Sequence, residues 1–280
     1  MESFEPRLLI AKFVEFLEGQ GKSYHTIIAY KKDLEQFVGY LLSQDKSDIR
    51  EVQRADIDGF IADLLAKDYT KKSASRKLNS IRTYFRFLKK EDVIKQNPSL
   101  EVSHPKYTQA APRILSKLEY RGLRDVAKED ARTYAIVELL LQTGIRIGEL
   151  AFIKLTDIVG DSMIIGKRKI PLNKAVLKAI EDYMVVRHPS DSEMLFVTKT
   201  GKPLLVRNIR SLITRCFKEV GIENAKVQDL RNTFIAYQLI NGASISYISK
   251  IVGHKRLSST EKYLDLVQEA PEKKEKLGEL

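Results

Sequence analysis

Polar side chains of four types in the C-terminal half could together act on a phosphodiester. Arg146 lies in "TGIRIGEL", Arg231 in "QDLRNTF", and His254 and Tyr263 in "VGHKRLSSTEKYL", with lysines between the two arginines. Arginine is permanently charged and can bind phosphate oxygens through two parallel N–H groups. A lysine can give up a proton when its pKa is tuned, and a tyrosine hydroxyl can attack phosphorus and form an ester. The combination predicts nucleophilic transfer of a phosphoryl group.

Each of these residues also has a simpler structural interpretation. Arg146 and Glu149, three residues apart, could form an ordinary surface pair, in which Glu149 orients the guanidinium. Arg231 could be a charge at the start of a helix, and Tyr263 a core residue with a polar edge. The occurrence of all of them in one chain favours the chemical interpretation.

The composition indicates an intracellular protein of two domains. The 280 residues are 43% hydrophobic and contain no apolar run of the length that crosses a membrane. The start "MESFEPRLLI" lacks the layout of a secretion signal, so we expect a soluble, cytoplasmic protein. Cys216 is the single cysteine, which excludes an internal disulfide and a cysteine-based zinc site. We expect no metal and no cofactor.

The net charge of +11, from 48 basic and 37 acidic residues, favours a polyanionic partner such as nucleic acid. Residues 70–90 concentrate this charge, with eight lysines and arginines and no acid. An amphipathic helix there would have one apolar and one basic face, and the basic face would contact DNA phosphates rather than only water. The residues proposed for this contact are Lys71, Lys72, Arg76, Lys77, Arg82 and Arg86.

The periodicity of the chain predicts a mainly α protein. We expect helices over 8–19, 24–42, 56–68 and 73–91 in a first domain, residues 1–95. Three prolines indicate a linker over 96–112, and His104 within it is interpreted as a loop residue rather than a ligand. In a second, mixed α+β domain, residues 113–280, we expect a small antiparallel sheet within 157–172. The helices expected around it are 133–144, a short helix after Gly144, 174–187, 208–221, 228–242, 244–253 and 258–267.

With these motifs in this order, nearly the whole chain resembles the tyrosine recombinase (lambda-integrase-like) family, most closely its Xer branch. The resemblance implies an N-terminal helical (SAM-like) core-binding domain that clamps DNA. Arg146 occupies the first arginine motif, and Arg231 the second, where Gln228 replaces the family's usual histidine. His254 and Tyr263 match the third motif at the family spacing.

The family's lysine lies at a β-hairpin turn, and here the turn reads "IIGKRKIPL". Lys167 is the preferred match and Lys169 the alternative.

The resemblance also implies the chemistry. Tyr263 attacks a scissile phosphodiester, forms a 3′-phosphotyrosine link and releases the 5′ oxygen. The two arginines neutralise the charge on the non-bridging oxygens, and Lys167 protonates the leaving oxygen. His254 hydrogen-bonds the phosphate or helps to accept the phenol proton, whereas Gln228 can form hydrogen bonds but cannot titrate. One ester replaces another, so neither ATP nor a metal is needed in principle.

The implied function is site-specific recombination at a double-stranded DNA site, resolving chromosome or plasmid dimers. The implied assembly is a homo-tetramer on DNA, joined through the C-terminal tail "LDLVQEAPEKKEKLGEL", although its composition is also typical of a disordered tail. The alternatives are an integrase of a mobile element or virus, a type IB topoisomerase, and a non-catalytic DNA-binding protein.

Overall fold

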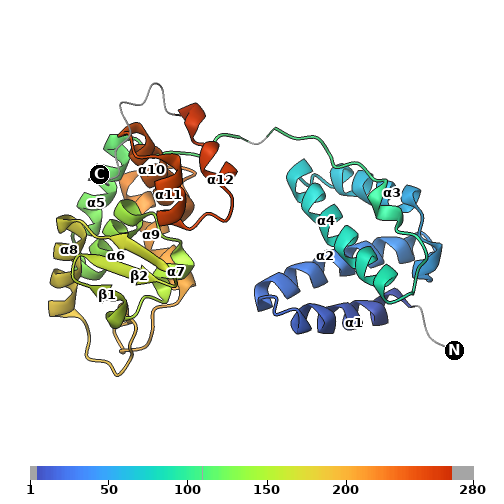
Figure 1. Cartoon of the computed structure of the whole chain (residues 1–280), viewed down its shortest axis with the longest axis horizontal. Helices are drawn as coiled ribbons and strands as arrows, with labels where there is room; N and C mark the ends of the chain where they lie inside the picture. The colour runs from blue at the N-terminus through green and yellow to red at the C-terminus, as the bar shows by residue number, and fades with distance from the viewer. Residues whose placement is uncertain (1–4, 109, 267–280) are drawn as a thin grey trace. The chain divides into compact units, whose positions relative to one another are not determined.

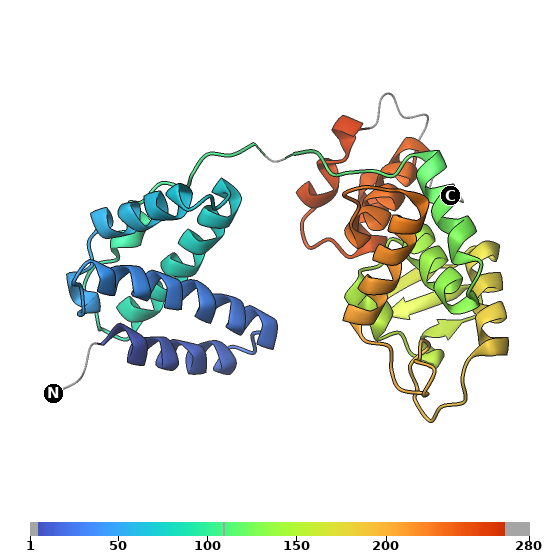
Figure 2. The same ribbon diagram turned by 180° about the vertical axis from the view of Figure 1, so that it is seen from behind.

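The computed structural model of the chain describes residues 5–108 and 110–266. It divides into two compact units, residues 1–109 and residues 110–280, which are drawn in Figure 1 and from behind in Figure 2. Each unit has a hydrophobic core of its own.

The first unit is built from helices, as the periodicity predicts. Hydroxyl side chains cap two of them: Ser23 Oγ accepts from the Thr26 N–H at 3.3 Å, and Thr70 Oγ1 accepts from the Ser73 N–H at 3.2 Å. The elements are α1 (Pro6–Gly19), α2 (Tyr24–Ser43), α3 (Arg54–Ala66), α4 (Lys71–Lys90) and the 3-10 turns η1 (Ile49–Glu51) and η2 (Pro98–Leu100).

A buried carboxylate joins α2 to α4 inside this unit. Asp33 is 2% exposed and accepts from Lys77 Nζ at 2.9 Å, from Ser80 Oγ at 2.8 Å and from both terminal nitrogens of Arg76. Lys77 is itself only 6% exposed. The charges of Asp33 and Lys77 are tolerated in the core because each satisfies the other.

The segment that follows α4 packs against it. Arg82 donates to the carbonyls of Ser99 and Val102 and to His104 Nε2, and Ser75 Oγ is 2.9 Å from His104 Nδ1. Burial, and then the charge of Arg82, lower the pKa of His104. His104 is therefore part of the attachment of this segment to α4, and the first unit extends beyond residue 95.

The second unit combines helices with a small sheet, as expected. Its helix α5 was not predicted from the sequence, although a capping box of Ser116 and Glu119 begins it. The helices are α5 (Lys117–Ala127), α6 (Ala131–Thr143), α7 (Ile147–Ala151), α8 (Lys174–Val186), α9 (Val206–Val220), α10 (Val227–Ile240), α11 (Ile245–Val252) and α12 (Ser258–Glu261), with 3-10 turns η3 (Leu155–Asp157) and η4 (Leu264–Leu266). In place of the single helix expected over 258–267, the described residues form the short helix α12 followed by the turn η4.

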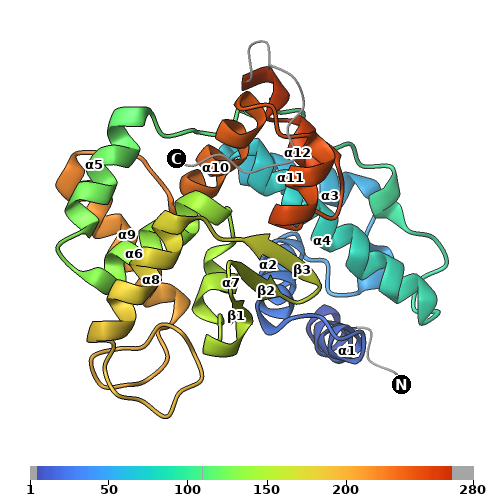
Figure 3. The same ribbon diagram turned by 60° about the vertical axis from the view of Figure 1, so that its left-hand side comes forward.

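The sheet has the strand order β1 (Ile158–Val159), β2 (Ser162–Ile165), β3 (Arg168–Pro171), all antiparallel. Met163 pairs with Ile170 and both are fully buried, so one face of the sheet packs on the core. Ile165 pairs with Arg168, which leaves a two-residue turn of Gly166 and Lys167 with Gly166 at φ +59°. Figure 3 shows β3 close to α11.

Among residues 5–108 and 110–266, no helix is long and apolar enough to span a membrane.

The Asp33 cluster gives a stability prediction. Asp33→Ala should lower the free energy of unfolding of the first unit by about 3–5 kcal/mol, because it leaves the buried ammonium of Lys77 without its carboxylate. Urea unfolding followed by circular dichroism measures the change. The control is Lys67→Ala, which removes an exposed pair with Asp63 and should change stability by about 0.5 kcal/mol or less. Equal effects of the two substitutions would contradict this account of the cluster.

Candidate active site

The C-terminal end of α11 gathers arginines from three other elements. Helix α11 ends at Gly253, whose φ of +67° favours glycine. The N–H groups of Gly253 and His254 bond back to the carbonyls of Lys250 and Ser249. The next three carbonyls, of residues 251–253, accept from arginine side chains instead. The cluster thus forms where a helix leaves acceptors without backbone partners and carries partial negative charge.

Arg146 and Arg231 meet at this helix end. Arg146, at the start of α7, donates through Nη2 to the Gly253 carbonyl at 2.8 Å and through Nη1 to the Val252 carbonyl at 3.4 Å. Arg231, on α10, donates to the Val252 carbonyl at 2.7 Å and to the Gly144 carbonyl at 2.5 Å. The two guanidinium groups therefore share one acceptor.

Arg231 and Arg146 differ in burial. Arg231 is 3% exposed, whereas 44% of the Arg146 side chain is exposed. Burial, and then the neighbouring charge of Arg146, lower the pKa of Arg231 to about 10. Arg231 is thus still charged at neutral pH, and both groups can hold an anion.

Glu149 supplies the nearby negative charge. Its Oε2 accepts from the backbone N–H of Arg146 at 2.8 Å, and its Oε1 accepts from Arg146 Nη1 at 3.1 Å. The same Oε1 accepts from Nη2 of Arg168 at 2.5 Å. The carboxylate that the sequence suggested as an orienting partner of Arg146 therefore orients two arginines.

Tyr263 lies in the interior of the second unit, beside this cluster. It is 1% exposed, and its hydroxyl donates to Asn232 Oδ1 at 2.8 Å. Asn232 directly follows Arg231 in α10, and Arg231 is close enough to affect the pKa of Tyr263. Burial raises this pKa, the charge of Arg231 lowers it, and Asp229 raises it, with a net increase.

Gln228 is linked to Tyr263 through Asn232. Gln228 is exposed on the first turn of α10, and its Nε2 donates to Asn232 Oδ1 at 3.3 Å. Asn232 Nδ2 donates to Asp229 Oδ1 at 3.2 Å, which fixes the orientation of the amide. Sequence reasoning missed Asn232, although its spacing of four residues from Gln228 places both on one helix face.

His254 follows the helix end and is half-buried. Its Nδ1 is 2.8 Å from Thr260 Oγ1 on α12. Burial, and then the charges of Arg231 and Arg146, lower its pKa to about 4. The imidazole is therefore neutral at physiological pH and has a nitrogen able to accept a hydrogen bond or a proton.

The hairpin places its three consecutive basic residues differently. Lys167 is exposed in the two-residue turn, next to Arg168, which reaches the cluster. Lys169 is exposed and pairs with Ile164 on the face opposite Arg168, because successive strand residues alternate between faces. Lys167 thus lies in the turn itself, whereas Lys169 lies on the strand. Sequence reasoning missed Arg168, which shares the face of the buried Ile170.

The basic residues of α4 do not form one exposed face. Lys71, Lys72 and Arg86 are exposed, and Arg76 is exposed but paired with Asp33. Lys77 is buried and Arg82 binds the segment after the helix, so these two are corrected here: in this structure they hold the first unit together.

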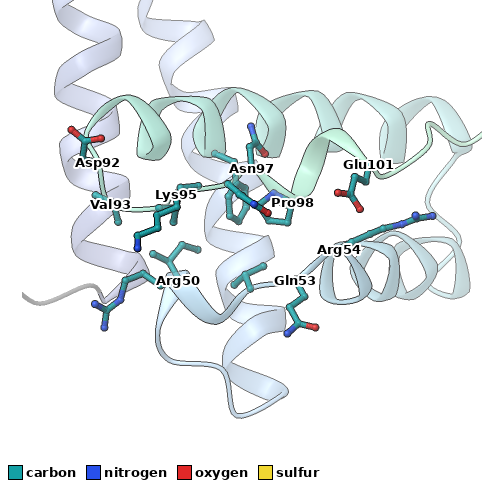
Figure 4. A pocket seen from close by; sticks show the side chains of 14 residues that line it. Arg50, Gln53, Arg54, Asp92, Val93, Lys95, Asn97, Pro98 and Glu101 are labelled. Carbon is teal, nitrogen blue, oxygen red and sulfur yellow. The ribbon is translucent and has the colours of Figure 1, made fainter.

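A pocket of about 740 Å³ opens in the first unit, outside the arginine cluster (Figure 4). Arg50, Arg54 and Lys95 line it together with Asp92 and Glu101. None of its 14 lining residues is a Ser, Thr, Cys, His or Tyr. Within the part of the chain that the structure describes, no group of His, Cys, Asp and Glu is arranged to hold a metal ion.

Comparison with known proteins covers nearly the whole chain. Residues 107–269 match the phage integrase family, and residues 10–92 match the phage integrase N-terminal SAM-like domain. The tyrosine recombinase XerC of Thermodesulfovibrio yellowstonii is 31% identical over 275 residues, which are 91% of this chain and 90% of the relative.

Solved structures agree with this match. A crystal structure of XerA recombinase has 28% identity and a TM-score of 0.53, covering 92% of this chain and 93% of that one. A lambda integrase tetramer bound to a Holliday junction has 17% identity and a TM-score of 0.73, covering 89% and 77%, which shows a shared fold. The mainly helical fold with its small antiparallel sheet is thereby confirmed, and the chain belongs to the phage integrase family, as a tyrosine recombinase of the Xer type.

Proposed function

We propose that this chain is a site-specific DNA recombinase that cuts and rejoins strands through a phosphotyrosine link at Tyr263. The observation that carries the proposal is the convergence of Arg146, Arg231 and His254 at one helix end, with Tyr263 beside them. Its XerC relatives support recombination as the activity. We propose the resolution of chromosome or plasmid dimers as its role.

The phosphate would be held by the paired arginines. A phosphodiester carries one negative charge, and the attack adds charge to the non-bridging oxygens. Arg146 is exposed and fixed by Glu149, so its guanidinium needs no reorganisation to meet that charge. Arg231 places a second positive charge behind it in a desolvated setting, where the attraction is stronger.

The proton of the nucleophile must leave Tyr263 during the attack. The amide oxygen of Asn232 accepts the hydrogen bond but cannot take the proton. His254 is neutral, so we propose it as the acceptor or as a hydrogen-bond partner of the phosphate. The bond between phosphorus and the 5′ oxygen then breaks, and Lys167 supplies a proton to that oxygen. In rejoining, the 5′ hydroxyl of another strand attacks phosphorus and releases Tyr263.

The proposed partner is a double-stranded DNA site bound by a homo-tetramer. Exposed Lys71, Lys72 and Arg86 are proposed to contact phosphates through the first unit. The tail expected to join protomers lies largely in residues 267–280, which are outside the described residues.

Covalent capture tests the nucleophile. Wild-type protein should become covalently attached to a nicked suicide duplex that carries a site selected from a random DNA pool. Tyr263→Phe should show no attachment, because phenylalanine has no oxygen to attack phosphorus. Denaturing electrophoresis of labelled DNA measures the product. Tyr237→Phe, a change on α10, is the control and should attach like wild type. Attachment by Tyr263→Phe would reject the assignment.

The lowered pKa of His254 predicts a pH-dependent stability. The unfolded chain protonates this imidazole below about pH 6.5, whereas the folded chain resists protonation until about pH 4. Its contribution is therefore complete above pH 6.5 and is lost as the pH falls towards 4. Between pH 7 and pH 5 the fall in Tm should be about 2–4 °C smaller for His254→Gln than for wild type. Thermal unfolding without DNA measures this, and equal falls would contradict it.

Replacement of Gln228 tests whether glutamine limits the reaction. Gln228→His should cleave a suicide duplex within about threefold of the wild-type rate, because an imidazole N–H can also donate to Asn232 Oδ1. Single-turnover cleavage measures the rate. A gain of about tenfold or more would show that a titrating group is needed at this position.

A further inference from the structure

We propose that Arg168 is a positioning residue that fixes the β2–β3 hairpin, and with it the amine of Lys167, against the arginine pair. Its guanidinium binds two different parts of the site. Nη2 donates to Glu149 Oε1 at 2.5 Å, and Nη1 donates to the Ile251 carbonyl at 2.8 Å. Arg168 thus joins the hairpin both to the carboxylate that orients Arg146 and to the end of α11.

The site is built closely around this guanidinium. A Cβ atom at Gly253 would lie 2.9 Å from Cζ and Nε of Arg168, so Gly253 leaves room for it. Two partners on separate elements suit the planar fork of arginine, whereas the single ammonium of a lysine is a point charge. The structure therefore assigns a specific requirement for arginine at this position.

Arg168 is placed to orient the hairpin rather than to neutralise the charge of a phosphate. Its side chain is 19% exposed, against 44% for Arg146. Glu149 Oε1 lies directly on its Nη2, so the carboxylate offsets much of its charge locally. Of these two side chains, Arg146 is therefore the one with more surface open to an incoming phosphate.

Lys167 depends on this attachment because the turn is short. Arg168 pairs with Ile165, and only Gly166 and Lys167 lie between them. Arg168 directly follows Lys167 in the chain, so the contacts of the Arg168 side chain also restrain the backbone of Lys167. Without the two bonds of Arg168, the turn would be free to move, and a small displacement of an acid from its target oxygen costs much of its effect.

The inference rests on the proposed role of Lys167 as general acid. A comparison of two leaving groups distinguishes a failure of the Arg168 inference from a failure of the Lys167 assignment. Paired suicide duplexes would carry either the natural 5′ oxygen or a 5′-bridging sulfur at the scissile phosphate. A thiolate leaves without protonation, because a thiol has a pKa of about 8.5. A defect in protonating the leaving group should therefore disappear on the sulfur duplex.

Arg168→Ala should cleave the oxygen duplex about tenfold to a hundredfold more slowly than wild type, and the sulfur duplex within about threefold of wild type. Lys178→Ala, which removes an exposed charge on α8, should match wild type on both duplexes. If Arg168→Ala fails to fold, Arg168→Lys keeps the charge but not the fork and should show the same pattern. DNA binding measured by gel shift should be unchanged.

Two outcomes would overturn the inference: a wild-type rate for Arg168→Ala on the oxygen duplex, or an equal defect on both duplexes. Lys167→Ala tests the acid itself on the same pair of substrates. If sulfur does not restore Lys167→Ala, the acid assignment fails. If sulfur restores Lys167→Ala but not Arg168→Ala, the acid assignment stands and the positioning role of Arg168 is rejected.

Discussion

The active site depends on the carbonyls at the end of α11 that lack backbone donors. A helix leaves its last acceptors without backbone donors, and burial makes their satisfaction obligatory. Here the carbonyls of residues 251–253 take their donors from Arg146, Arg168 and Arg231. These side chains come from the residue that precedes α7, from β3 and from α10, so one helix end draws together segments that are far apart in sequence. Like charges can share this space because carbonyl dipoles and Glu149 surround them.

The same electrostatic arrangement sets the protonation of the remaining groups. Burial, and then the positive cluster, lower the pKa of His254 and keep it neutral, although an exposed imidazole would be partly charged near neutral pH. For Tyr263 the two influences oppose each other, since burial disfavours the phenolate and Arg231 favours it. The site thus holds a neutral imidazole and a protonated phenol beside charged groups that can bind an anion, and this arrangement suits the roles proposed for them in phosphoryl transfer.

Sequence reasoning reached the helical fold and the small sheet, because periodicity is a local property. It singled out the arginine, histidine and tyrosine motifs by residue type and by family resemblance, and the structure brings Arg146 and Arg231 to one shared carbonyl. It missed Asn232 and Arg168, whose importance comes from contacts across 31 and 83 residues of sequence. It also assigned Lys77 and Arg82 to a DNA-facing surface. Composition shows that α4 is basic, but only the packed structure shows that Asp33 and the segment after α4 engage these side chains.

The hydrogen bond from Tyr263 to Asn232 has a consequence for the protein in the absence of DNA. A phenol that donates to an amide has no base to activate it, and at 1% exposure it meets little water or solute. For the proposed attack by Tyr263, the hydroxyl would have to exchange its amide partner for a phosphate. Under the proposed mechanism, protein without DNA would therefore leave this hydroxyl unreactive, and strand cleavage would depend on bound DNA.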